Sequence, residues 1–81
     1  MRPPKITAAK AVSDRVLVVE FAGDESRRYD ISALLAREMF APLKNPALFK
    51  AVTVEPGGYA VSWGADIDIS ENELWRGGEP A

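Results

Sequence analysis

The strongest pattern in the chain is an alternation of apolar residues over residues 15–21. Leu17, Val19 and Phe21 recur with a period of two, so they share one face of an extended strand. Two valines occupy the other face together with a glutamate. Because both faces carry β-branched or apolar residues, we predict a strand that is either central or partly covered on both sides.

Weaker alternation predicts further strands before and after this one. Residues 6–12 are small and apolar, and residues 26–31 return from a turn at Gly23, which supplies the positive φ that such turns need. Residues 51–55 and 59–63 flank a Pro–Gly–Gly turn. We therefore predict hairpins, which favour antiparallel pairing.

A narrow apolar stripe predicts a short helix over residues 32–38. Leu34 and Leu35 belong to one helical face, and Asp30 or Ser32 stands where a cap is needed. The stripe is narrow enough to cover one side of a sheet only. After this helix we expect an extended path through a Phe–Ala–Pro–Leu sequence.

Two capping patterns predict further helical turns. Asn45 followed by proline is typical of a helix N-terminus and predicts one turn over residues 46–50. Ser70 three residues ahead of Glu73 forms a capping box and predicts a short helix over residues 71–76. A Gly–Gly pair then ends the helix.

Together these elements predict one α+β domain over residues 1–81, with a core at 5–76 and a tail at 77–81. We expect a small, single-layer, mostly antiparallel sheet of about four to five strands. One short helix packs on it and a short C-terminal helix follows. The 81 residues fit one domain. A chain this small leaves little room for a deep pocket.

Composition excludes several kinds of chemistry. The chain has no cysteine and no histidine, so disulfides, thiolate nucleophiles and histidine-based catalytic triads are excluded. The commonest zinc ligands are also missing. We assign no catalytic residue, metal or cofactor. No apolar run is long enough for a secretory signal or a membrane span, and we expect a cytoplasmic protein without a membrane partner.

The order of the segments resembles that of the bacterial family called domain of unknown function 2442. The resemblance covers residues 6–76 and rests on an ordered set, not on one motif. Its segments are Phe21, residues 29–35, residues 40–49, residues 61–63, Asp68 with Ile69, and Leu74 with Trp75. This chain departs from the family in two places: Gly23 and Asp24 stand where Asp–Gly is common, and Trp75 stands where tyrosine is common.

The resemblance implies a compact α+β domain of the stand-alone form, without a C-terminal helix-turn-helix unit. It carries over no catalytic residue. Some members are fused to a DNA-binding domain and others are encoded beside a second small protein. Both arrangements imply regulation or an antitoxin-like pairing.

An acidic cluster near the C-terminus is the first candidate site. Asp66, Asp68 and Glu71 offer the oxygen ligands of a divalent cation, or a pair of carboxylates for acid–base catalysis. The favoured interpretation is structural: the aspartates alternate with buried isoleucines, and glutamates stabilise the N-terminal turn of a helix. A divalent-metal-dependent enzyme is the alternative hypothesis.

Basic residues form the second candidate. Residues 1–50 hold 9 Lys and Arg against 6 Asp and Glu, and residues 51–81 hold 1 against 6, so the net charges are +3 and −5. Arg15, Arg27 and Arg28 are the candidates for weak nucleic-acid binding. A sequence pI near 5.0 is far from the basic footprint of most nucleic-acid domains, so direct binding is not expected.

The leading hypothesis is a non-catalytic interaction or regulatory domain. Large aromatic side chains are enriched at binding hot spots, and the charge asymmetry is able to orient a partner. We expect a protein partner, antitoxin-like or not, or a homo-oligomer. The expected interaction surface comprises Phe40, Trp63, Trp75, Asp66 and Asp68. For the two tryptophans, burial in the core is the favoured interpretation.

Overall fold

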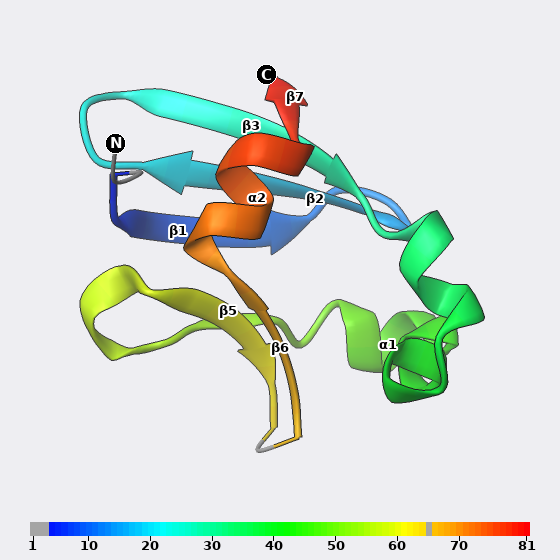
Figure 1. The fold of residues 1–81 in the computed structure, drawn as a ribbon. Helices are drawn as coiled ribbons and strands as arrows, with labels where there is room; N and C mark the ends of the chain where they lie inside the picture. Colours follow the sequence, from blue (N-terminus) through cyan, green and yellow to red (C-terminus); the bar gives the residue numbers. More distant parts are fainter. Residues whose placement is uncertain (1–3, 65) are drawn as a thin grey trace.

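The computed structural model describes residues 4–64 and 66–81, whose strands form two antiparallel sheets (Figure 1). The first sheet contains β1 (Ile6–Ala11), β2 (Val16–Phe21), β3 (Glu25–Asp30) and β7 (Glu79–Pro80), in that order. The second contains β4 (Thr53–Val54), β5 (Ala60–Trp63) and β6 (Ile67–Ser70), in that order.

The short helical segments lie between these strands. They are the 3-10 turns η1 (Ser32–Ala36), η2 (Glu38–Lys44) and η3 (Pro56–Gly58), and the α-helices α1 (Pro46–Phe49) and α2 (Glu71–Gly77). The α+β class and the antiparallel pairing are confirmed. The strands form two sheets where the sequence predicted one layer, and residues 32–49 connect the two sheets through helical turns.

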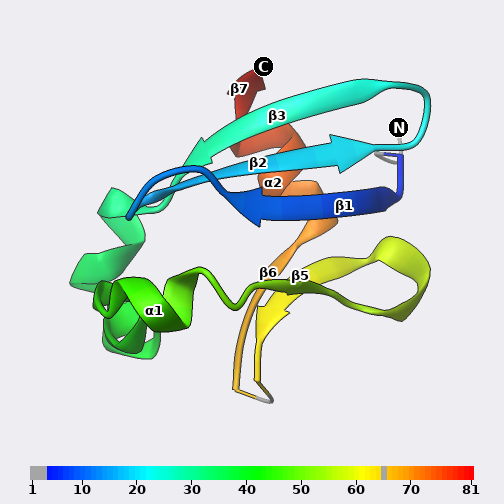
Figure 2. The same cartoon turned by 180° about the vertical axis from the view of Figure 1, so that it is seen from behind.

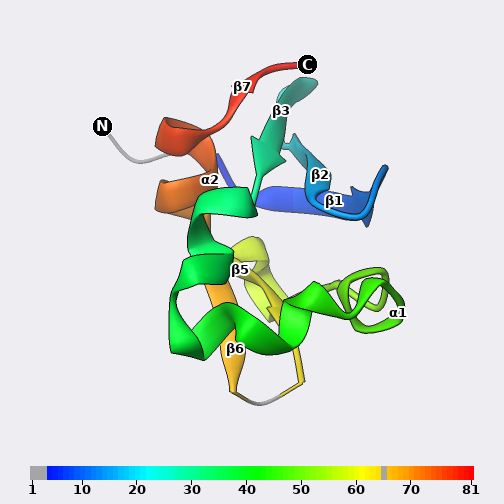
Figure 3. The ribbon, with the colours of Figure 1, turned by 90° about the vertical axis from the view of Figure 1, so that its right-hand side faces the viewer.

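The two sheets lie one above the other (Figure 2). One hydrophobic core joins them. Leu17, Val19 and Phe21 all point into it from β2, which lies between β1 and β3 as predicted. Val61 and Trp63 enter the same core from β5. The sheets therefore bury their apolar faces together, while α2 covers the first sheet from one side (Figure 3).

The predicted hairpin turn forms between β2 and β3. Gly23 has φ +88° and Asp24 has φ +63°. Both lie in the left-handed region, which glycine adopts freely and aspartate tolerates better than most residues. The Gly–Asp order is therefore compatible with the hairpin.

The first predicted helix is a 3-10 segment. The Asp30 carboxylate accepts a hydrogen bond of 2.8 Å from the Ser32 N–H. The N-cap is nevertheless Ile31 and has no side-chain cap, so the prediction that Asp30 or Ser32 caps this segment is wrong. The expected extended path after it is wrong, because η2 continues through Pro42 with Phe40 and Leu43 buried. In a 3-10 helix, side chains three residues apart lie above one another. Phe40 and Leu43 therefore form a narrow apolar stripe that faces the core.

The predicted Asn45 cap is confirmed, and the Ser70 half of the predicted capping box forms. The Asn45 side chain accepts from the Ala47 N–H at 3.0 Å, and the Ser70 hydroxyl accepts from the Glu73 N–H at 3.2 Å. The segment expected as a tail instead pairs with β3 through β7, with Arg28 opposite Glu79. A two-residue strand carries too little alternation to be predicted.

Within the described residues, none of the helices has the length and apolar content that a membrane crossing requires.

Candidate functional site

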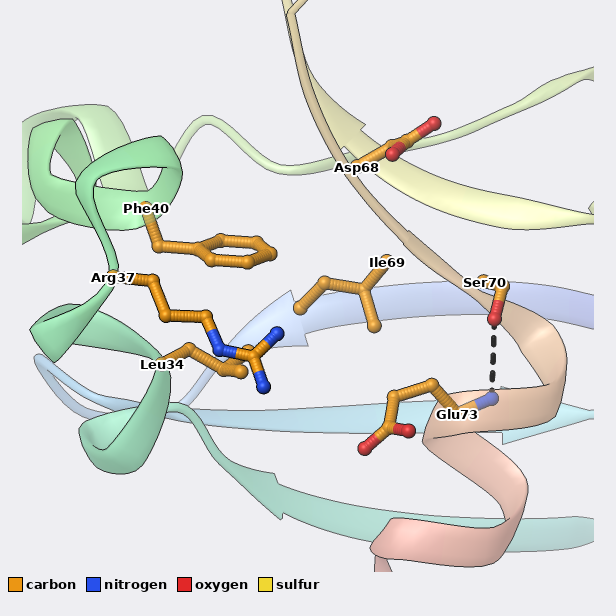
Figure 4. A pocket seen from close by; sticks show the side chains of 7 residues that line it. All are labelled: Leu34, Arg37, Phe40, Asp68, Ile69, Ser70 and Glu73. Carbon is orange, nitrogen blue, oxygen red and sulfur yellow. Dashed lines mark hydrogen bonds between the residues drawn. The ribbon is translucent and has the colours of Figure 1, made fainter.

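A half-open groove lies between the η1–η2 segment and β6 (Figure 4). Its volume is about 210 Å³. We call it the edge groove, because β6 is the last strand of its sheet. Its lining comes from four elements and the residue between η1 and η2: Leu34, Arg37, Phe40, Asp68, Ile69, Ser70 and Glu73.

The floor of the edge groove is apolar. Phe40 and Ile69 are buried, and Leu34 is half-buried at its margin. Ile69 points inward because β6 alternates, with its two isoleucines buried and Asp68 and Ser70 exposed. Phe40 reaches the floor because the 3-10 geometry of η2 turns it toward the core.

Charged groups of both signs stand at the mouth of the edge groove. The Arg37 side chain extends from the η1–η2 junction toward Ile69 and Glu73 (Figure 4). The Glu73 carboxylate accepts a hydrogen bond of 2.8 Å from the Tyr29 hydroxyl. Burial raises the pKa of Tyr29 well above its usual range, and the bond to Glu73 raises it further. Tyr29 therefore remains a neutral donor that holds Glu73 in place.

The free edge of β6 presents main-chain groups to the edge groove. The Glu71 N–H donates to the Tyr59 carbonyl at 2.9 Å. Tyr59 and Glu71 are therefore a hydrogen-bonded pair at the start of the antiparallel ladder between β5 and β6. Hydrogen-bonded pairs alternate in such a ladder, so Ile69 and Ile67 bond to β5. The N–H and C=O of Asp68 consequently point away from β5, and no partner for them is found among the described residues.

Two of the predicted interaction residues meet at this site. Phe40 lies in the floor and Asp68 lines the β6 side, with its carboxylate pointing away from Arg37 (Figure 4). Asp66 is exposed just before β6 and does not line the groove.

Trp63 belongs to the core and is not accessible to a partner. Its side chain is 4 % exposed, and its indole N–H donates to the Phe49 carbonyl at 2.8 Å. The Trp63 and Phe49 rings stack with centroids 5.9 Å apart. The large aromatic residue on β5 therefore has a structural role.

Trp75 lies away from the edge groove and is half-buried between two neighbours. Phe21 contacts it edge to face, with ring centroids 5.0 Å apart. The Arg27 guanidinium lies 3.7 Å from the centre of the indole ring. Both contacts attach α2 to the first sheet.

The acidic cluster does not converge. Glu71 accepts two hydrogen bonds from the Lys5 ammonium, at 2.8 and 3.0 Å, and that ammonium also lies 3.8 Å from the centre of the Tyr59 ring. Asp66 and Asp68 are exposed. In the described part of the chain, no three acidic side chains lie close enough together to hold a metal ion.

The three arginines also diverge. Arg27 and Arg28 are adjacent in a strand, so their side chains point to opposite faces of the first sheet. Arg27 packs on Trp75 on the inner face, while Arg28 is exposed. Arg15 precedes β2 and is exposed.

Sequence reasoning missed Arg37, Leu34 and Glu73 as members of one site. Leu34 was expected in a helix stripe and Glu73 in a capping box, and no local pattern singled out Arg37. Glu73 lies more than 30 positions from the other two. Only the tertiary fold brings them together.

Comparisons with known proteins identify a family without an assigned activity. No curated protein and no solved structure matches the chain. The family model described as "Protein of unknown function (DUF2442)" matches residues 6–80, nearly the whole chain. The resemblance found in the sequence is thereby confirmed, and the chain belongs to the DUF2442 family of proteins of unknown function.

Proposed function

We propose that the chain is a non-catalytic interaction domain that binds another small protein through the edge groove. The pairing is regulatory and antitoxin-like, as the family resemblance implied. Its expected compartment is the cytoplasm, which stays a prediction.

One observation carries this proposal: an apolar floor, charges of both signs and an unpaired strand edge meet in a single half-open groove. A protein partner is able to use all three at once, through side-chain burial, ion pairing and main-chain hydrogen bonds. A volume of about 210 Å³ suits one or two side chains of a partner. It is small for a drug-sized ligand, whose pockets hold roughly 300–1,000 Å³.

The alternative functions have less support. A metal-dependent enzyme would need Asp66, Asp68 and Glu71 to converge, yet Glu71 is held by Lys5. A nucleic-acid binder would need Arg15, Arg27 and Arg28 on one surface, yet Arg27 packs on Trp75. No observation favours either over protein binding.

The test is co-purification of the tagged full-length chain from its native cell with two charge-reversal variants. Arg37→Glu alters the mouth of the groove, and Lys10→Glu makes the same charge change on an exposed strand residue outside it. We expect one partner to be retained at a fixed stoichiometry by the wild type and by Lys10→Glu, and to be lost by Arg37→Glu. Equal retention by both variants would show that the partner does not use the groove.

A further inference from the structure

The unpaired edge of β6 borders the apolar floor of the edge groove. In the described residues, the N–H and C=O of Asp68 point outward beside the apolar floor. An outward main-chain pair at an exposed edge is a template for a further strand. A peptide that adds a strand gains affinity from the main chain and specificity from alternate side chains.

We propose that the edge groove receives an extended segment of the partner as an antiparallel strand beside β6, with a basic residue opposite Asp68 and an apolar residue next to it in the floor. This inference rests on the proposed function and deepens it, because it states the conformation and the chemistry of the bound segment.

The alternation of β6 sets which partner side chain goes where. The residue opposite Asp68 shares its face, and the Asp68 carboxylate points away from Arg37 (Figure 4). The next partner residue points to the opposite face, where Ile69 points inward. It therefore enters the floor beside Leu34 and Phe40.

Charge decides that the residue opposite Asp68 is basic. Directly opposed unlike charges stabilise an antiparallel pair, and like charges destabilise it. Asp66 adds a second exposed carboxylate beside β6. This side of the groove therefore favours a cationic segment.

The same charges argue against a second copy of this chain as the occupant. A two-fold pairing of β6 with itself centred on Asp68 would place two identical carboxylates opposite each other. A pairing of the two β6 strands in another register still places the two acidic strand edges next to each other. A foreign segment with alternating apolar and basic residues avoids this repulsion.

The test uses an acetylated, amidated heptapeptide, Gly-Thr-Val-Lys-Val-Thr-Gly, titrated into the isotope-labelled full chain. Two control peptides replace the central lysine by glutamate or by N-methyl-lysine. We expect amide shift changes at residues 67–70 with the lysine peptide. Compared with the lysine peptide, we expect the glutamate peptide to bind about threefold to tenfold more weakly. We expect the peptide whose lysine is methylated on the backbone nitrogen to bind about tenfold more weakly, because it lacks the main-chain N–H donor.

Two protein variants of matched chemistry complete the test. Asp68→Lys should reverse the preference, so that the glutamate peptide binds better. Glu20→Lys makes the same change on an exposed strand residue away from the groove and should keep the lysine preference. Equal binding of all three peptides, or unchanged amide shifts at residues 67–70, would overturn strand addition.

The two proposals fail in different ways. A native partner that is lost with Arg37→Glu, while no peptide perturbs β6, leaves the interaction through the groove intact and overturns strand addition. In the opposite case, the native partner binds Arg37→Glu as well as it binds the wild type, while the lysine peptide still pairs at Asp68. That result supports strand addition and overturns the groove as the native interface.

Discussion

The Tyr29 hydroxyl donates a 2.8 Å hydrogen bond to the Glu73 carboxylate, which joins β3 to α2 across 44 positions of the chain. The bond also explains why only one of the two hydrogen bonds of the predicted capping box forms. Ser70 caps the Glu73 N–H, but the Glu73 side chain turns to Tyr29 and does not return to the Ser70 N–H. The mouth of the edge groove depends on this choice.

Removing the Tyr29 hydroxyl should lower stability. Tyr29→Phe keeps the buried ring and loses one hydrogen bond to a carboxylate, so we expect a loss of about 1–2 kcal/mol in the free energy of unfolding. Urea denaturation measures it. Tyr59→Phe is the matched control, since its ring is exposed and retains its contact with Lys5. Equal stability of both variants would contradict a structural role for the bond.

The same tyrosine should make the fold sensitive to high pH. Burial and Glu73 raise the pKa of Tyr29 above its ordinary value of 10.0. The unfolded chain then releases this proton first, so stability is full below about pH 10 and falls as the pH rises further. Denaturation curves at pH 8 to 11 should fall more steeply for the wild type than for Tyr29→Phe. Parallel curves would exclude this linkage.

Asp30 should contribute in the opposite pH range. Hydrogen bonds from the Ser32 hydroxyl and N–H hold the pKa of Asp30 below its ordinary value of 3.8. Its contribution is present above that value and is lost as the pH falls through the lower folded pKa. Asp30→Ala should cost about 0.5–1 kcal/mol at pH 7. The gap to the wild type should narrow in acid, and an unchanged gap at pH 2 would contradict the assignment.

Trp63 should be the more costly of the two tryptophans to truncate. Trp63→Phe leaves a cavity and removes the donor to the buried Phe49 carbonyl, so we expect a loss of about 2–4 kcal/mol. Trp75→Phe retains an aromatic contact with Phe21 and should cost about 1 kcal/mol. Urea denaturation compares them, and a larger loss for Trp75→Phe would reverse the roles assigned to the two residues.

Gly58 should not tolerate a side chain. Its φ is +74°, and a Cβ there would collide with the main chain of Ile6. Gly23 has φ +88° with open space around it. Gly23→Ala should therefore cost about 1 kcal/mol from backbone strain alone, and Gly58→Ala at least about 3 kcal/mol. Similar losses in both variants, measured by thermal or urea unfolding, would show that η3 can move away from β1.

Local patterns in the sequence predicted most of the elements correctly. Leu17, Val19 and Phe21 share a buried face because a strand alternates strictly. Asn45 and Ser70 cap helices because their side chains reach an N–H two or three residues away. Each of these predictions needs only neighbouring residues.

Long-range packing decided the division into two sheets and the candidate site. The choice of Glu73 between Ser70 and Tyr29 depends on where β3 lies, and no local rule contains that position. Arg37 and Asp68 line one groove because η1, η2 and β6 pack on the same core.

The sequence by itself therefore determined which residues form strands, turns and caps, and which catalytic chemistries are excluded, because these depend on residue type and short spacing. Only the tertiary structure decided that Glu71 is held by Lys5 and that Asp68 faces an open edge. Those outcomes depend on contacts between segments that are far apart in the chain. Such contacts exist only once the core has formed.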